Sequence, residues 1–209
     1  MIQEQIWLHR LATGICHLDI IVDVETVAKQ CLEYIILLHK WNHAYNLTAI
    51  RTIEEMIDRH ILDSLAILPR MEGSRVLDVG TGAGLPGIPL ALSSPTKQVV
   101  LLDSNGKKTR FLTEVKRCLS LSNIEIVQAR VEDYQPTLLF NTVVSRAFAD
   151  IPSMLDKTEH LLLKPGKWVA MKGPQVHTEL TEISYPYHLK SYVSSGACGK
   201  RYCVIIEHI

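Results

Sequence analysis

One short segment limits the possible folds of this chain more than any other. Residues 75–87 read RVLDVGTGAGLPG, an apolar run that carries Asp78 near its end and continues into three alternating glycines, Gly80, Gly82 and Gly84. Glycine has no Cβ and adopts positive φ readily, so a loop with this spacing turns sharply after a strand while its backbone lies against a ligand. The segment predicts a strand that leads into a nucleotide-binding loop.

A second acid stands where a nucleotide-binding sheet needs one. The next apolar run, residues 99–102, is followed by Asp103, which lies 19 residues after Gly84. An acid about 20 residues beyond such a loop stands at the end of the neighbouring parallel strand, where its carboxylate can accept hydrogen bonds from a ribose. We therefore expect Asp103 to bind both hydroxyls of a ribose.

Two ligand classes compete for this loop, because residues 82–87 also fit the Gly-x-Gly-x-x-Gly pattern of dinucleotide-binding proteins. A dinucleotide loop holds a pyrophosphate anion at a helix N-terminus, where the neighbouring carboxylate of Asp78 would be unfavourable. S-adenosylmethionine (SAM) instead carries a sulfonium and an ammonium, which suit an acid at the end of the strand. The pattern favours SAM over a nicotinamide or flavin dinucleotide, and over a turn that binds nothing.

Composition excludes several classes of protein. The 22 basic side chains balance the 22 acidic ones, so any basic surface must be local. The five cysteines include no Cys-x-x-Cys pair, which argues against a zinc site or a disulfide framework and favours a reducing cytoplasm. We find no signal peptide in residues 1–10 and no apolar run long enough to cross a membrane.

His39 and His43 are one helical turn apart but lack a third ligand, so we expect no metal.

The pattern of apolar residues divides the chain near residue 70. Residues 1–70 are expected to form helices that pack on the core, and residues 71–209 to form an α/β domain in which strands alternate with helices. Within it, strands are expected at 75–80, 98–103, 124–129, 142–147, 167–172, 188–194 and 201–207, and helices at 85–93, 107–120, 150–163 and 175–183. The last two strands are separated only by a turn at 195–199, so they should pair as an antiparallel hairpin.

The clearest N-terminal helix covers residues 52–68. Thr52 and Glu55 form a capping box, and apolar residues follow at helical spacing. His60 and Ser64 lie on the apolar face, so we interpret His60 as a hydrogen-bonded core histidine. Arg59 and a second residue one turn later, Asp63, are expected to form an ion pair. An earlier helix should run from residue 24 to about residue 42, capped by Asp23.

The end of the fourth strand of the α/β domain bears on the acceptor atom. Residues 145–148 read Ser-Arg-Ala-Phe, without the Asn/Asp-Pro-Pro-aromatic sequence common in enzymes that methylate exocyclic amines. No proline precedes a cysteine, which disfavours covalent catalysis on a pyrimidine carbon. An acceptor with a free lone pair, such as guanine N7, needs only placement behind the SAM methyl. A small-molecule methyltransferase and a non-catalytic SAM- or nicotinamide-binding module stay open.

Taken together, several collinear segments resemble one family. They are residues 41–42, 46–50, 59–64, 78–89, 101–104, 106–108, 145–148 and 172–173, which read WN, NLTAI, RHILDS, DVGTGAGLPGIP, LLDS, GKK, SRAF and KG. This combination resembles the RsmG (GidB) family of bacterial 16S rRNA (guanine-N7)-methyltransferases. The Leu-Pro-Gly-Ile-Pro continuation of the loop and the Ser-Arg-Ala-Phe segment are unusual among methyltransferases in general.

The resemblance implies a class I SAM-dependent methyltransferase fold, Rossmann-like, with a seven-stranded, mostly parallel sheet and an antiparallel final strand. It implies a cytoplasmic enzyme, which we expect to be a monomer, that forms 7-methylguanosine in small-subunit rRNA. The SAM contacts of the family carry over to Gly80, Leu85, Val131, Glu132 and Arg146, and Arg146 is also expected to position the reactants without any general base. One departure is Cys203 with Glu207, where relatives commonly carry Leu and Lys.

Basic residues at 107, 108, 110, 116 and 117 and at 200–201 are candidates for an RNA-facing surface. Solvated helix faces have the same composition, so the charge pattern alone does not decide between the two. It is the family resemblance that favours RNA as the partner. The target guanine must then be exposed by the rRNA or turned out of its stack.

Overall fold

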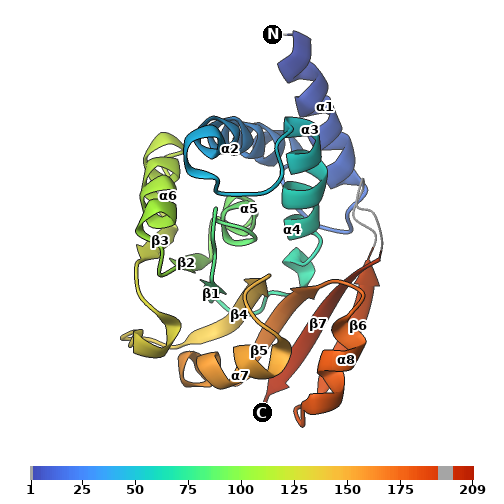
Figure 1. Cartoon of the computed structure of the whole chain (residues 1–209). Coiled ribbons are helices and arrows are strands. Elements are labelled where there is room, and N and C mark those ends of the chain that lie inside the picture. The colour runs from blue at the N-terminus through green and yellow to red at the C-terminus, as the bar shows by residue number, and fades with distance from the viewer. Residues whose placement is uncertain (1, 193–199) are drawn as a thin grey trace.

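A seven-stranded sheet in the order β3-β2-β1-β4-β5-β7-β6 forms the centre of the molecule (Figure 1). The computed structural model describes residues 2–192 and 200–209. The strands are β1 (Arg75–Val79), β2 (Gln98–Leu102), β3 (Ile124–Val127), β4 (Phe140–Arg146), β5 (Leu162–Lys172), β6 (Tyr187–Tyr192) and β7 (Arg201–His208). Strands β1 to β5 pair in parallel, whereas β7 runs antiparallel to both β5 and β6. This is the mostly parallel, seven-stranded sheet that the family resemblance implied.

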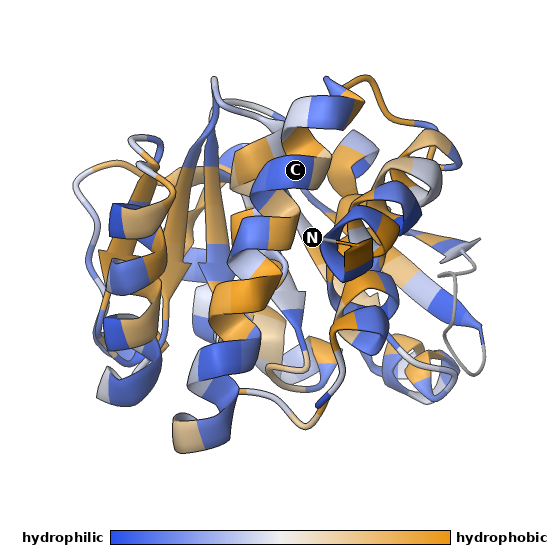
Figure 2. Cartoon of the chain, turned by 90° about the horizontal axis from the view of Figure 1, so that it is seen from above, coloured by the Kyte–Doolittle hydropathy of each residue, from blue (hydrophilic) through white to orange (hydrophobic). Residues whose placement is uncertain are grey.

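Helices cover both faces of the sheet because its buried strands are apolar on both sides. One face packs against α5 (Gly87–Ser93) and α6 (Gly106–Cys118), and the other against α7 (Ile151–Thr158) and α8 (Val176–Glu179). Alternate residues of each strand enter the two clusters; in β2, for example, Leu101 joins the first and Leu102 the second. Figure 2 shows mostly hydrophobic strands between helices whose colouring alternates around each turn.

The segment before β1 is helical, as predicted, and packs into the same hydrophobic cluster as α5 and α6. It contains α1 (Ile2–Cys16), α2 (Val24–Tyr45), the short α3 (Ile53–Met56) and α4 (Asp63–Leu65). Both predicted N-caps are present: Asp23 accepts from the Thr26 amide at 3.2 Å and Thr52 from the Glu55 amide at 3.3 Å. The division of the chain near residue 70 stays a prediction.

The helix expected over residues 52–68 contains a change of winding. Between α3 and α4, residues Ile57–Leu62 form a π-helical turn, η1, and residues Leu68–Arg70 form a 3₁₀ turn, η2. A π turn spreads its residues more widely than an α turn, and such turns are frequent at functional sites. Apolar spacing alone cannot reveal this widening, because the buried stripe continues through it.

The ends of several elements differ from the predicted ones. The helix predicted over 150–163 ends at Thr158 and is followed by a 3₁₀ turn, η4 (Glu159–Leu161), because Leu162 already pairs with Phe140 as the first residue of β5. The helix predicted over 175–183 consists of α8 and a 3₁₀ turn, η5 (Leu180–Glu182). Strands β6 and β7 pair as the expected hairpin, while its predicted turn at 195–199 lies outside the described residues.

Candidate active site

The parallel strands end at one edge of the sheet, and two adjoining cavities open there. The first, which we call the Arg146 cavity, has a volume of about 440 Å³. The second, the Asp103 cavity, has a volume of about 270 Å³. Gly80, Lys108 and Ala147 line both of them, so the two cavities meet over the end of β1. An open α/β sheet binds its ligands at this edge.

The glycine loop forms the floor between the two cavities. Gly80, Gly82 and Gly84 have φ of +64°, +62° and +95°, values that residues other than glycine rarely adopt. A Cβ on Gly82 would lie at an ordinary contact distance of 3.9 Å from its nearest neighbours, the Gly80 carbonyl oxygen and Lys108 Nζ, so it would meet no clash. A Cβ on Gly80 would instead meet Phe148 at 2.5 Å. Gly82 therefore leaves room for a ligand, whereas Gly80 leaves room for the aromatic ring that follows β4.

Asp78 lies beneath this loop and lines neither cavity. Its Oδ2 accepts hydrogen bonds from the Thr81 hydroxyl at 2.6 Å and from the Gly87 amide at 2.7 Å, which ties both ends of the loop to β1. Its Oδ1 is buried and has no partner among the described residues. Burial raises the pKa of Asp78 to about 7. Asp78 thus shapes the loop from below, and its direct contact with a cofactor stays a prediction.

Asp103 closes the end of β2, as the spacing predicted. Its carboxylate accepts from the Gly82 and Asn105 amides, each at 2.9 Å, and lies 3.3 Å from the Lys108 ammonium. These contacts orient the carboxylate toward the Asp103 cavity, which it lines. Two further predicted residues, Val131 and Glu132, lie on the 3₁₀ turn η3 (Val131–Asp133) and line the same cavity.

The predicted residues thus divide between the two cavities. Asp103, Val131 and Glu132 belong to the Asp103 cavity; Gly82, Leu85 and Arg146 belong to the Arg146 cavity, and Gly80 to both. Gly84 lines neither, since a Cβ there would meet the Ile88 side chain at 2.5 Å, so it serves the packing of the loop on α5. That each lining residue touches the cofactor stays a prediction.

Arg146 is the last residue of β4, and its side chain reaches the π turn η1. Its Nη1 donates to the Arg59 carbonyl oxygen at 3.0 Å and lies 3.2 Å from His60 Nδ1. The same Nη1 is 3.8 Å from Asp63 Oδ2. Ala147 follows with φ of +53°, a strained conformation for a residue with a side chain and one that is frequent at functional sites. The widened turn and the first residue of α4 therefore present three acceptors to one guanidinium.

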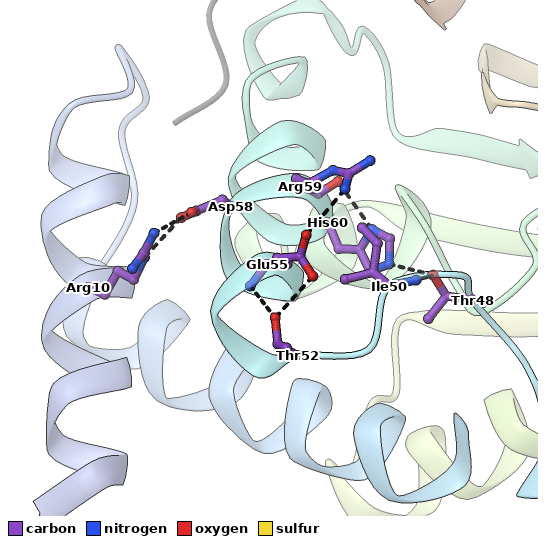
Figure 3. A network of polar contacts seen from close by, with 8 residues as sticks. All are labelled: Arg10, Thr48, Ile50, Thr52, Glu55, Asp58, Arg59 and His60. Carbon is purple, nitrogen blue, oxygen red and sulfur yellow. Dashed lines mark hydrogen bonds and ion pairs between the residues drawn. The ribbon is translucent and has the colours of Figure 1, made fainter. Parts of the chain in front are cut away.

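His60 connects this group to the segment before η1 (Figure 3). Its Nε2 lies 2.8 Å from the Thr48 hydroxyl, and its ring is buried. Burial, together with the positive charge of Arg146, lowers the pKa of His60 to about 3. The neutral ring can therefore donate from Nε2 to Thr48 and accept at Nδ1 from Arg146. The prediction of a buried, hydrogen-bonded histidine is confirmed, but it did not anticipate that His60 lines a cavity.

The expected ion pair between Arg59 and Asp63 is wrong. Arg59 lies 3.5 Å from Glu55 instead, while Asp63 Oδ1 accepts from the Tyr192 hydroxyl at 3.0 Å. Asp63 faces inward because it follows His60 by three residues on the buried side of the helix. That position was the available signal: a charged residue on an apolar stripe needs a buried partner. The sequence could not show that the partners are Arg146 and Tyr192.

Although the chain carries no net charge, basic side chains outnumber acidic ones in the lining of the Arg146 cavity. Its single carboxylate is Asp63, whereas five basic side chains line it: Arg59, Lys108, Arg146, Lys172 and Arg201. Of the basic groups expected to face RNA, only Lys108 and Arg201 lie here. Lys116 and Arg117 are engaged elsewhere, with the Ile124 carbonyl oxygen and with Glu114.

The structure also bears on two other sequence features, the His39/His43 pair and the apolar character of the helices. His39 and His43 stack edge to face with ring centres 4.7 Å apart, and no group of three or more metal-ligating side chains occurs within residues 2–192 and 200–209. In those same ranges, no helix has the length and apolar character needed to cross a membrane.

Comparison with known proteins identifies relatives over most of the chain. The family model described as rRNA small subunit methyltransferase G matches residues 27–199. A protein of Legionella pneumophila with the name ribosomal RNA small subunit methyltransferase G is 51% identical over 185 residues, which cover 88% of this chain and 89% of the relative. A protein of the same name from Pseudomonas syringae is 44% identical over 200 residues, 94% of each chain.

Solved structures with little sequence similarity share the fold. A SAM-dependent methyltransferase from Aquifex aeolicus superposes with a TM-score of 0.57 at 16% identity, over 74% of this chain and 93% of the other. A precorrin-6y C5,15-methyltransferase from Geobacter metallireducens superposes with a TM-score of 0.55 at 13% identity, over 79% and 93%. At these identities the likeness establishes the class I methyltransferase fold.

Proposed function

The chain belongs to the rRNA small subunit methyltransferase G family, and on that premise we propose that it transfers a methyl group from SAM to N7 of one guanine in small-subunit rRNA. It is a SAM-dependent methyltransferase. The observation that carries the proposal is the glycine loop between the two cavities: a Cβ on Gly82 would meet no atom closer than 3.9 Å, and the carboxylate of Asp103 is anchored to the Gly82 amide at 2.9 Å.

These residues fit the cofactor. The cradle at Gly82 is one that a larger side chain would fill, and Asp103 presents an oriented carboxylate to the adjoining cavity, which suits the hydroxyls of a ribose. Val131 and Glu132 stand beside it where an adenine edge would lie, and Glu132 is held by Lys157 at 2.9 Å. When bound, SAM supplies a methyl group on a sulfonium, which leaves a neutral thioether after transfer.

The Arg146 cavity supports an anionic acceptor. Five basic side chains line it, and although Arg59, Lys108 and Lys172 also pair with carboxylates outside the lining, their charged groups can contact a phosphodiester chain, and such contacts dominate the affinity of proteins for nucleic acids. Lys172 is fixed by Glu179 at 2.7 Å, and Arg146 by the π turn, so these charges are placed in advance of binding. Placed charges orient the acceptor, which is the main catalytic requirement for this chemistry.

The lining of the cavity also agrees with an acceptor that loses no proton. Among residues 2–192 and 200–209, no cysteine and no Asn/Asp-Pro-Pro-aromatic segment lines it. His60 has its pKa lowered to about 3 and both ring nitrogens engaged, so it is a poor base. Guanine N7 carries a free lone pair, and its methylation removes no proton. We therefore infer that Arg146 positions the reactants and that no residue acts as a general base.

The test is transfer of tritiated methyl groups from SAM to small-subunit rRNA isolated from cells that lack the enzyme. We expect the label to appear as 7-methylguanosine after nucleoside digestion. Small-subunit rRNA from cells that contain the enzyme is the control and should accept little label, because its target is already methylated. Label in a different nucleoside would contradict the N7 assignment. Label in a small-molecule extract, with none in rRNA, would favour the alternative of a small-molecule methyltransferase.

We further infer that the enzyme acts in the cytoplasm as a monomer.

A further inference from the structure

We propose that Asp63 and Arg146 together form a subsite for an α-amino-acid head group, with Asp63 accepting from the α-ammonium and Arg146 donating to the α-carboxylate of the cofactor. The inference rests on the proposed function and assigns to Asp63 a role in cofactor binding. Asp63 belongs to the N-terminal helical segment, not to the sheet or to the glycine loop. The subsite therefore joins residues that are far apart in the chain.

Asp63 has one carboxylate oxygen available for a ligand. Its Oδ1 accepts from Tyr192, but no described residue donates a hydrogen bond to Oδ2, whose polar contact is the distant Arg146 Nη1 at 3.8 Å. The side chain is 5% exposed and lines the Arg146 cavity. A buried carboxylate with an unused oxygen requires a cationic or hydrogen-bonding partner. Burial raises the pKa of Asp63, and an ammonium beside it would oppose that shift.

Arg146 has free hydrogens beside that oxygen. Its polar contacts with described residues all involve Nη1: the Arg59 carbonyl oxygen, His60 Nδ1 and Asp63 Oδ2. Nε and Nη2 therefore remain for a bound molecule, and they form the fork that matches a carboxylate. A carboxylate acceptor and a guanidinium donor held this close are complementary to a zwitterion. They are less suited to a phosphate, which Asp63 would repel.

The position of the pair within the site agrees with this ligand. Both residues line the Arg146 cavity together with Gly80 and Gly82 of the glycine loop. The adjoining Asp103 cavity contains the acid expected to bind the ribose. A ligand with a nucleoside at one end and an amino acid at the other would then span the two cavities over their shared floor, with its sulfur near the middle.

The experiment compares two ligands that differ only in the head group. S-adenosylhomocysteine carries the α-ammonium and α-carboxylate, whereas 5′-methylthioadenosine has the same nucleoside and thioether without them. We expect Asp63→Asn to weaken binding of S-adenosylhomocysteine by about tenfold or more, the loss typical of a hydrogen bond to a charged group, in titration calorimetry. Binding of 5′-methylthioadenosine should change by less than about twofold, since it does not reach Asp63.

Two further variants keep the result interpretable. Asp58→Asn is a matched control, because Asp58 is a buried carboxylate of the neighbouring turn η1 but pairs with Arg10 and lines neither cavity (Figure 3). It should leave both affinities unchanged. Tyr192→Phe removes the hydrogen bond to Asp63 while keeping the ring, and it should weaken only S-adenosylhomocysteine, by a smaller factor. If Asp63→Asn does not fold, the Tyr192→Phe variant still tests the subsite.

The other outcomes overturn the subsite. Equal losses for both ligands would make Asp63 a structural support of the loop. An unchanged affinity for S-adenosylhomocysteine, with a raised KM for rRNA, would place Asp63 against the target base instead. Failure of the proposed function looks different: wild-type protein would then transfer no methyl group to rRNA, whether or not it binds S-adenosylhomocysteine, whereas the subsite is judged only by the difference between the two ligands.

Discussion

The two cavities of the active site are built in different ways. The Asp103 cavity is formed by consecutive strand ends and the turns that follow them, within residues 79–157. The Arg146 cavity is closed by side chains that meet across the whole chain: Arg146 and Arg59 are 87 residues apart, and Tyr192 and Asp63 are 129 apart. The first is a product of local sequence, whereas the second exists only after the N-terminal helices have packed on the sheet.

The difference matters for how each half acts. In the Asp103 cavity the carboxylate of Asp103 is held by two backbone amides, an arrangement that suits a cofactor shared by many enzymes. Contacts in the Arg146 cavity are made by charged side chains from distant parts of the chain, which can hold the head group of the cofactor beside the acceptor. A class I fold can therefore keep the first half while the second half, where cofactor and acceptor meet, varies with the substrate.

The largest effect should come from Gly82→Val, because Gly82 belongs to the glycine loop between the two cavities and lines the Arg146 cavity. Valine at a φ of +62° is strained by about 1–2 kcal/mol, and its side chain would project into the Arg146 cavity. We expect no measurable binding of S-adenosylhomocysteine in calorimetry, together with a retained cooperative thermal transition. Gly82→Ala is the control, with the same backbone strain and a smaller side chain, and should retain weakened binding. A folded Gly82→Val variant that binds normally would show that the cofactor does not approach this loop.

The same contrast explains what could be predicted from the sequence. All seven strands and the glycine loop were predictable because their signals are local: apolar runs, alternating glycines, and an acid at a fixed distance. Asp103 was placed correctly at its strand end for this reason. The ion pair of Arg59 with Asp63 was predicted wrongly, because a helical spacing shows which residues are neighbours on a helix but not which element covers them. The π turn was missed for a related reason, since apolar periodicity tolerates one extra residue.

A smaller effect is expected from Asp103→Ala, which tests the local half. Loss of hydrogen bonds to a charged group should weaken cofactor binding by about 1.5–3 kcal/mol, which is roughly tenfold to 150-fold in Kd. Both S-adenosylhomocysteine and 5′-methylthioadenosine carry the ribose, so calorimetry should show similar losses for the two. This equality is the contrast with Asp63→Asn. A change of less than twofold for either ligand would mean that Asp103 only anchors the Gly82 amide.

Arg146→Lys tests the assembled half and should reduce the rate of methyl transfer by about tenfold, or about 1.4 kcal/mol of activation free energy. Lysine keeps the positive charge but cannot offer the fork of donors that contacts the π turn with one nitrogen and a ligand with the others. Single-turnover measurements on rRNA provide the rate. Arg117→Lys is the control, because Arg117 pairs with Glu114 on the exposed side of α6. A wild-type rate for Arg146→Lys would make Arg146 a structural residue.

The smallest expected effect is that of pH. If guanine N7 is the acceptor, no proton leaves in the chemical step, and the single-turnover rate should be flat above neutral pH while the fold persists. The assembled half agrees with this expectation, because the lowered pKa of His60, about 3, keeps its ring neutral throughout that range. Asp78 is the group whose titration could enter the profile, since burial raises its pKa to about 7. The profile should therefore be measured for the wild-type enzyme and for Asp78→Asn, which removes that ionisation and keeps an oxygen for Thr81 and Gly87. A rate that still rises with a single pKa near 7 in Asp78→Asn would indicate proton removal, and with it an acceptor other than N7.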